Sequence, residues 1–192
     1  MAAAAEILAR HDELRELRLR EEPVWRSLAR LFVPDEQEFE SRNRRREDDR
    51  ADLFDSTPLY ALENFTGGLF GQMTNPASRW VEFGVEGDDD LAQFSPVKRY
   101  LWQLGSVFYG SVAPEVSAFY PEIPSAFANA GVFGLGCLHQ EERVGKGIVD
   151  RSLPIGQLFI DKDADGNIDT VDREYCLRGR HLKKEFGYGG VV

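Results

Sequence analysis

Apolar residues recur at helical spacing in the first part of the chain, and polar residues separate them. Residues 2–21 have high helix propensity, and a narrow apolar stripe runs along them at Ile7, Leu14 and Leu17. Pro23 interrupts this pattern and suits the first turn of a second helix, which is predicted to reach about Leu31. The sequence therefore predicts two N-terminal helices, followed by a polar connector up to residue 50.

Two further helices are predicted in the middle of the chain, each with a proline in its first turn. One follows a cap at Ser56 or Thr57, and its apolar positions are Leu59, Leu62, Phe65, Leu69 and Met73. The other begins with a cap at Ser95 and has an aromatic face. Between these helices, Arg79–Val85 is predicted to be a short strand. The segment after the second helix is expected to be divided into short helices by Pro114, Pro121 and Pro124.

From Gly134 onward the pattern changes to short strand-like runs separated by Gly, Pro and Asp. Four strands of a small antiparallel β-meander are predicted in GLGCLHQEERV, GIVDRSLP, GQLFIDKD and NIDTVDREYCLR. A final amphipathic helix, GRHLKKEFG, is predicted to end at Gly187. This order of elements indicates an α+β fold. We expect two domains, with the N-terminal helices and connector in residues 1–50 and the α+β domain in residues 51–192.

The composition indicates a folded chain without a membrane span. Of the 192 residues, 42% are hydrophobic, so a core can form. Charged residues interrupt the apolar stretches within about ten residues, which is too short for a transmembrane helix. The formal net charge is −10. A surface of that sign repels nucleic acid, because tight DNA binding relies on Lys and Arg to displace counterions.

Two local features of the sequence are compatible with this composition. The stretch SRNRRREDDR, residues 41–50, is a basic cluster that acidic residues interrupt. It is interpreted as a solvated connector, and an arm that contacts phosphate or another subunit is the alternative. Cys137 and Cys176 are far apart and lack metal-ligand spacing, which is typical of two reduced thiols in a cytosolic setting.

The most motif-like stretch is DKDADGNIDTVD, residues 161–172. It resembles the calcium loop of an EF-hand, in which a Gly follows alternating carboxylates, and the candidate ligands are Asp161, Asp163, Asp165 and Asp172. An EF-hand needs a helix on each side, whereas Pro154 and Gly156 precede this loop and β-branched residues follow it. The favoured interpretation is a hairpin with Gly166 in its turn. A calcium-binding regulatory module is the alternative.

No other stretch predicts a catalytic or cofactor site. The segment TGGLFGQM lacks the Lys-Ser/Thr pair of a P-loop, so its glycines are expected to allow close helix packing at Gly67, Gly68 and Gly71. Cys137 and His139 would face the same side of a strand, either as a metal pair or as a buried thiol beside a rim histidine. No nucleophile triad or acid–base pair stands out, so no enzyme, cofactor or metal site is predicted. A hydrolase with an unrecognised site would require a deep polar pocket.

The segment DLFDSTPLYALENFTGGLFGQMTNPASRWVEF, residues 52–83, resembles the signature region of the portal proteins, or head-to-tail connectors, of short-tailed bacteriophages. In that family an Asp-Ser-Thr helix start leads through a small-residue helix to Leu-Thr-x-Pro and then Trp-Phe. The matching residues are Asp55, Ser56, Thr57, Ala61, Gly68, Leu69, Met73, Thr74, Pro76, Trp80 and Phe83. Similar stretches follow in the same order at PVKRYLWQL, FANAGVFGLGCLHQEE and residues 153–187, so the resemblance covers most of the chain.

This resemblance implies a structural protein of the virion that serves DNA packaging and ejection. Portals of this family form a ring of about twelve copies at one capsid vertex. The implied partners are other copies of the chain, the capsid protein, the terminase, the tail adaptor, and double-stranded DNA that passes through without sequence-specific contact. No enzymatic activity, cofactor or membrane is implied, and assembly would occur in the host cytoplasm. Residues 51–192 would form part of the outer wing, and the acidic charge suits a conduit that does not grip DNA.

Members of that family are longer than this chain, which ends just after the wing-like helix. It is therefore interpreted as a fragment, a split gene product or a truncated remnant that lacks the stem, clip and crown. We expect the isolated chain to be monomeric or weakly self-associating, with the N-terminal helix reaching a neighbouring subunit. Core and subunit contacts are expected to share the aromatic residues Trp80, Phe83, Trp102, Phe108, Tyr109, Phe119 and Phe127.

Overall fold

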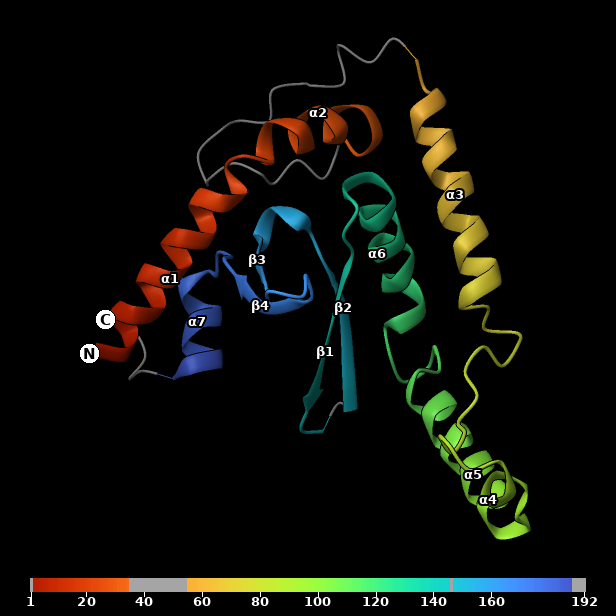
Figure 1. Ribbon diagram of the computed structural model, residues 1–192. Coiled ribbons are helices and arrows are strands. Elements are labelled where there is room, and N and C mark those ends of the chain that lie inside the picture. The colour runs from red at the N-terminus through yellow and green to blue at the C-terminus, as the bar shows by residue number, and fades with distance from the viewer. Residues whose placement is uncertain (1, 35–54, 146, 188–192) are drawn as a thin grey trace. The chain divides into compact units, whose positions relative to one another are not determined.

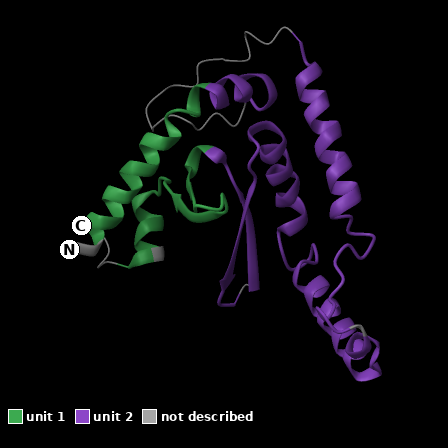
Figure 2. Ribbon diagram, viewed as in Figure 1, with its two compact units in different colours: residues 1–23, 156–192 green, residues 24–155 purple. Residues whose placement is uncertain are grey.

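The computed structural model describes residues 2–34, 55–145 and 147–187 (Figure 1). The chain divides into two compact units (Figure 2). One combines residues 1–23 with 156–192, and the other comprises residues 24–155. The basic cluster at 41–50 and the expected domain boundary near residue 50 lie outside the described residues. The division into residues 1–50 and 51–192 therefore stays a prediction.

The described residues contain helices and two small antiparallel sheets, which confirms the predicted α+β class. The helices are α1 (Ala2–Arg18), α2 (Glu22–Phe32), α3 (Thr57–Met73), α4 (Asp89–Gln93), α5 (Ser95–Ser111), α6 (Phe119–Phe133) and α7 (Gly179–Phe186). The strands are β1 (Cys137–Arg143), β2 (Gly147–Leu153), β3 (Leu158–Lys162) and β4 (Ile168–Arg173), and the short 3₁₀-helix η2 (Ile155–Gln157) follows β2. No helix among the described residues is long and apolar enough to cross a membrane.

Helix α3 begins as predicted after the Asp-Ser-Thr sequence, but its cap comes from Asp55. The Asp55 Oδ1 atom accepts hydrogen bonds from the Thr57 backbone N–H at 2.9 Å and from the Thr57 hydroxyl at 2.7 Å. These bonds to the ionised form lower the pKa of Asp55. Pro58 lies in the first turn, where its missing N–H has no intrahelical partner. The side chain of Ser56 makes no capping hydrogen bond.

Helix α6 corrects the prediction that prolines divide this part of the chain. Residues 119–133 form one continuous helix that contains Pro121 and Pro124. Pro121 falls in the first turn, where no intrahelical donor is needed, and Pro124 removes one donor without ending the helix. The helix ends instead at Gly134, whose φ of 76° is a left-handed conformation that glycine adopts readily.

The four predicted strands are present, but they form two hairpins rather than one meander. β1 pairs with β2 from Cys137↔Leu153 to Arg143↔Gly147, and β3 pairs with β4 from Leu158↔Arg173 onward. Pro154 has no N–H for a ladder, and η2 turns the chain directly after it. The break at Pro154 and η2 therefore separates β2 from β3, and the two strands belong to different sheets. Helix α7 ends at Gly187 as predicted.

The glycines that allow close packing are not the predicted ones. A Cβ atom built at Gly67, Gly68 or Gly71 would have nothing within 4 Å, so these positions of α3 are not packed against any of the described residues. Helix α3 instead packs on α6 through another face. At the α3–α6 contact a Cβ at Gly131 would lie 2.6 Å from the Phe65 ring. Between α6 and the start of β1, a Cβ at Gly136 would lie 2.2 Å from the Ala126 carbonyl oxygen. The expectation of close packing at the first three glycines is wrong, because none of the described residues covers them.

Candidate functional site

The predicted strand at Arg79–Val85 is wrong, and an aromatic anchor takes its place. The hydroxyl of Tyr109, on α5, accepts hydrogen bonds from the backbone N–H groups of Trp80 and Val81, both at 2.6 Å. The same hydroxyl donates to the Val81 carbonyl oxygen at 3.2 Å. A strand needs a partner strand to satisfy its backbone groups, whereas here one side chain satisfies three of them. The segment is consequently irregular but fixed to α5.

An aromatic cluster surrounds this anchor. The rings of Trp80 and Phe119 stack with centroids 5.5 Å apart and an interplanar angle of 6°. The indole Nε1–H of Trp80 donates to the Tyr120 hydroxyl at 3.3 Å. Edge-to-face contacts with Trp80 or with one another add Phe83, Phe108 and Tyr109. Five of the aromatic residues singled out in the sequence therefore pack together.

Trp102 lies apart from the packed cluster on the outer face of α5. It is 62% exposed, and the guanidinium of Arg79 lies 5.5 Å from its ring centroid. Other large apolar side chains of the same helix are also exposed, namely Tyr100, Leu104 and Val107. Exposed apolar area of this kind is a feature of proteins that bind other chains.

Replacing Tyr109 by Phe tests the anchor. The variant keeps the ring packing but leaves two backbone donors and one acceptor without the hydroxyl. We expect a loss of about 1–3 kcal/mol in the free energy of unfolding. Urea denaturation followed by tryptophan fluorescence measures it. Tyr100→Phe is the matched control, because Tyr100 is 63% exposed. Equal stability of both variants and the unmodified chain would show that water replaces the hydroxyl at no cost.

A charged contact joins α1 to the β3–β4 hairpin. The imidazole of His11 lies with Nδ1 3.4 Å from the Asp172 carboxylate and Nε2 3.5 Å from the Glu174 carboxylate. The guanidinium of Arg15 reaches Glu174 at 3.2 Å, and that of Arg10 donates to the Thr170 hydroxyl. The basic side of α1 therefore faces acidic groups on and after β4.

Arg18 and Leu14 form the buried part of the same contact. The Arg18 guanidinium donates to Glu22 at 2.9 Å and to the Leu158 carbonyl oxygen at 3.1 Å, and it lies 4.2 Å from the Phe159 ring centroid. Burial lowers the pKa of Arg18, and the Glu22 carboxylate opposes that shift. Leu14 is only 2% exposed, whereas the rest of the predicted stripe, Ile7 and Leu17, is largely exposed.

A second buried polar group lies between α6 and the β1–β2 hairpin. Asp150 of β2 is 3% exposed and accepts hydrogen bonds from the Ser117 hydroxyl and the Gln140 amide. The Ser117 oxygen in turn accepts from the Phe119 N–H at 2.9 Å, next to the start of α6. The Glu122 carboxylate accepts from the Ser152 N–H at 2.8 Å. These bonds fix the hairpin to α6 and leave the hydroxyl of Ser117 engaged rather than available as a nucleophile.

The stretch at 161–172 is the β3–β4 hairpin that the sequence favoured. Strands flank it where an EF-hand has helices, and Gly166 has a φ of 87° in the turn. Asp163 closes the turn, because its Oδ1 accepts from the N–H groups of Asp165 at 2.9 Å and Asn167 at 2.8 Å. Among the described residues, no three His, Cys, Asp or Glu side chains are grouped to hold a metal ion.

The pH response of this turn follows from Asp163. Hydrogen bonds, first of all from the Asn167 N–H, lower its pKa from the usual 3.8. The stabilisation is therefore present above that value and is lost as the pH falls through the lower folded value. We expect the Asn167 amide resonance to shift with a midpoint below pH 3.8. Nuclear magnetic resonance titration measures it, with Asp165→Ala as the control and Asp163→Ala as the variant that loses the response. A transition near neutral pH would contradict this account.

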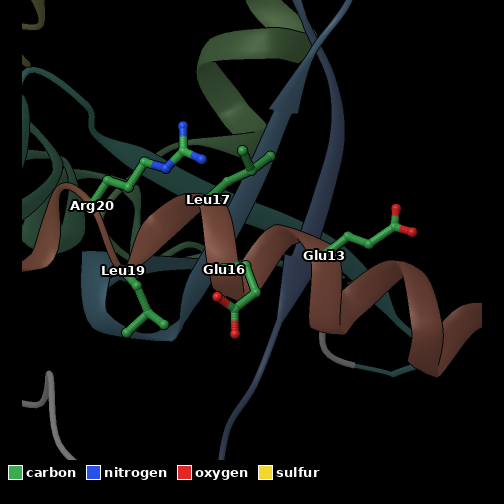
Figure 3. A pocket seen from close by; sticks show the side chains of 5 residues that line it. All are labelled: Glu13, Glu16, Leu17, Leu19 and Arg20. Atoms are coloured by element: carbon green, nitrogen blue, oxygen red, sulfur yellow. The ribbon is translucent and has the colours of Figure 1, made fainter.

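Two remaining predicted features do not form a site. Cys137 is half-buried and His139 is exposed on β1, and the strand partner of His139 is Arg151. An open depression on the surface is lined by Glu13, Glu16, Leu17, Leu19 and Arg20 (Figure 3). All five come from α1 and the turn that follows it. A single helix surface does not provide the deep polar pocket that a hydrolase would need.

The hydrogen bonds and ring contacts described above hold helices and hairpins in place. A model of the bacteriophage head to tail connecting protein family matches residues 4–191, and the chain belongs to that family. The portal protein of Salmonella phage epsilon15 is 26% identical over 190 residues, covering 96% of this chain and 33% of the relative. The probable portal protein of Bordetella phage BPP-1 is 24% identical over 182 residues, covering 94% and 32%. The chain thus spans about a third of these relatives, and the predicted resemblance is confirmed.

The sequence alone did not single out several residues that hold the fold. The sequence indicates Tyr109 only as one of several aromatic residues, and no sequence pattern indicates Ser117 or Asp150. Arg18 and Glu22 are four positions apart, but the turn at residues 19–21 separates α1 from α2, so helical spacing does not predict their ion pair. For the Ser117–Asp150 bond no local signal exists, since 33 positions separate the two residues.

Proposed function

We propose that this chain is a portion of a phage portal and contributes to the ring at one vertex of the capsid. The observation that carries the proposal is the family match over residues 4–191, together with two portal relatives that align with more than nine-tenths of the chain. The ring would contain about twelve copies arranged with cyclic symmetry. As a portal component, the chain would belong to the virion and assemble in the host cytoplasm.

The proposed partners are other copies of the chain, the capsid protein, the terminase and the tail adaptor. Double-stranded DNA would pass through the completed ring without sequence-specific contact. The net charge of −10 supports this role, because like charge lowers adhesion of DNA to the wall that it passes. The exposed apolar side chains of α5 support contact with other chains. The role is structural, and no enzymatic step is assigned to it.

A mixing experiment tests this function. Size exclusion coupled to light scattering gives the mass of the isolated chain, which we expect to be that of a monomer or a weak oligomer. The chain is then refolded together with the portal protein of phage epsilon15, which is about three times longer. Incorporation of labelled chain into the ring supports the proposal. A chain that stays monomeric at high concentration and never enters the ring would count against it. A labelled protein of unrelated fold, refolded with the portal in the same way, is the control for non-specific adhesion.

A further inference from the structure

Helix α7 is a short basic helix in an acidic chain. It spans Gly179–Phe186, and its exposed cations include Arg180 and Lys184, with Arg178 at its N-cap. The chain as a whole has a net charge of −10. Leu182 and Phe186 lie four residues apart and therefore share one side of the helix. Leu182 is half-buried and Phe186 is 55% exposed. The helix thus presents an apolar stripe bordered by positive charge.

The length of α7 indicates that it gains from a partner. Isolated helices shorter than about 12–15 residues are only marginally stable in water. Ordering the first turn loses more conformational free energy than its single hydrogen bond provides. Helix α7 has eight residues, and none of its described side chains is buried. Most helical stability in proteins comes from packing of an apolar face. A surface that covers Phe186 and neutralises the cations would therefore stabilise it.

A surface of the opposite character lies in residues 82–94 of the other unit, here called the acidic loop. Its exposed carboxylates are Glu82, Glu86, Asp88 and Asp90. Two large apolar side chains stand beside them, Leu91 at 43% and Phe94 at 60% exposure. Two hydrogen-bonding groups hold the loop in shape, one next to its start and one in its middle. Tyr109 binds the backbone just before it, and Asp88 caps α4 by accepting from the Leu91 N–H at 2.8 Å.

We propose that α7 of one copy docks on the acidic loop of the next copy. This inference rests on the proposed function, since it names a contact between neighbouring portal copies. The two surfaces carry charges of opposite sign, and each combines two exposed or half-exposed apolar side chains with three or more charges of one sign. Charge complementarity of this kind steers encounter and fixes register. Because the two surfaces are different parts of the chain, the contact is heterologous, as a closed ring requires.

Carbodiimide cross-linking of the unaltered chain tests the contact directly. The reagent joins a Lys184 amine to a Glu82 or Glu86 carboxylate as an amide, and the water lost is taken up by the carbodiimide. An equal mixture of ¹⁴N- and ¹⁵N-labelled chains is cross-linked at low ionic strength and analysed by mass spectrometry. We expect linked peptides that carry one light and one heavy half, which arise only between two copies. Linked peptides of one isotope alone would overturn the proposal, since they arise within a single chain.

Charge reversal tests it independently. In sedimentation equilibrium, Arg180→Glu with Lys184→Glu is expected to weaken self-association about tenfold, and Glu82→Lys with Glu86→Lys to do the same. An equal mixture of the two double variants is expected to associate, because reversed charges then meet across the contact. The control variants Arg20→Glu and Glu63→Lys each reverse one charge at an exposed position outside the two surfaces. They should leave the strength of self-association nearly unchanged. Circular dichroism verifies that each variant is folded.

The possible outcomes separate this inference from the function on which it rests. If the charge reversals leave self-association unchanged, the docking of α7 on the acidic loop is contradicted, whereas the proposed portal function is not. Absence of association, together with failure to enter the epsilon15 ring, contradicts both. Loss of association in each double variant with recovery in their mixture supports the docking. Raising the ionic strength to about 0.5 M should weaken the contact in the unaltered chain, since the screening length then falls to a few ångströms.

Discussion

Replacing Gly136 by Ala is expected to lower the free energy of unfolding by about 3 kcal/mol or more. A Cβ at this position would lie 2.2 Å from the Ala126 carbonyl oxygen and 3.2 Å from the Ala130 Cβ. Both neighbours belong to α6, and the closer one is a backbone atom that a rotamer change cannot move. Either α6 or the start of β1 must shift, which disturbs the packing of α6 on the hairpin. Urea denaturation with tryptophan fluorescence measures the effect.

Gly68→Ala is the matched control for this prediction. Gly68 lies on α3 with nothing within 4 Å of the added atom. Alanine has a higher helix propensity than glycine, so the free energy of unfolding of this variant should rise by about 1 kcal/mol. The opposite signs of the two substitutions distinguish a steric cause from a general intolerance of glycine replacement. A stable Gly136→Ala variant would mean that α6 and β1 are further apart than described. A destabilised Gly68→Ala variant would mean that this face of α3 is covered in solution.

Local sequence signals predicted the elements well because each signal acts within a few residues. Gly187 and Gly134 mark helix ends, and Gly166 marks the hairpin turn, since each adopts a positive φ that other residues avoid. Pro58 in the first turn correctly indicated the start of α3. The same reasoning favoured the hairpin over an EF-hand at 161–172, because Pro154 excluded a preceding helix.

Pairing between distant segments was harder to predict. The strand expected at Arg79–Val85 has suitable residues, yet the group that satisfies its backbone is the Tyr109 hydroxyl, which lies 29 positions after Trp80. Similarly, Gly67 and Gly131 are both small, and only the tertiary contact of Phe65 decides which of them permits close approach. Side-chain periodicity contains no information on either point. The family resemblance at residues 52–83 was recognisable because it depends on residue identity rather than on pairing.

Replacing Arg18 by Ala is the second substitution with a large expected effect, and it addresses the contact of α1 with the β3–β4 hairpin. The Arg18 guanidinium binds Glu22 at 2.9 Å and the Leu158 carbonyl oxygen at 3.1 Å. The two side chains are only 7% and 11% exposed, so removal of the cation leaves the Glu22 carboxylate in a poorly solvated place without that guanidinium. We expect the free energy of unfolding to fall by about 3–5 kcal/mol, which is the range observed when one partner of a buried ion pair is removed.

A double-mutant cycle separates the ion pair from the packing of the Arg18 side chain. Arg18→Met keeps much of the apolar contact with Phe159, whose ring centroid lies 4.2 Å from the guanidinium carbon. If the charge dominates, Arg18→Met should be nearly as harmful as Arg18→Ala, and Glu22→Gln should recover part of the loss in the Arg18→Met background. If packing dominates, Arg18→Met should be tolerated and Glu22→Gln should add nothing. Arg20→Ala, an exposed neighbour, serves as the control and should change stability by less than about 0.5 kcal/mol. An equally mild result at Arg18 would show that α1 does not depend on this residue for its position on the hairpin.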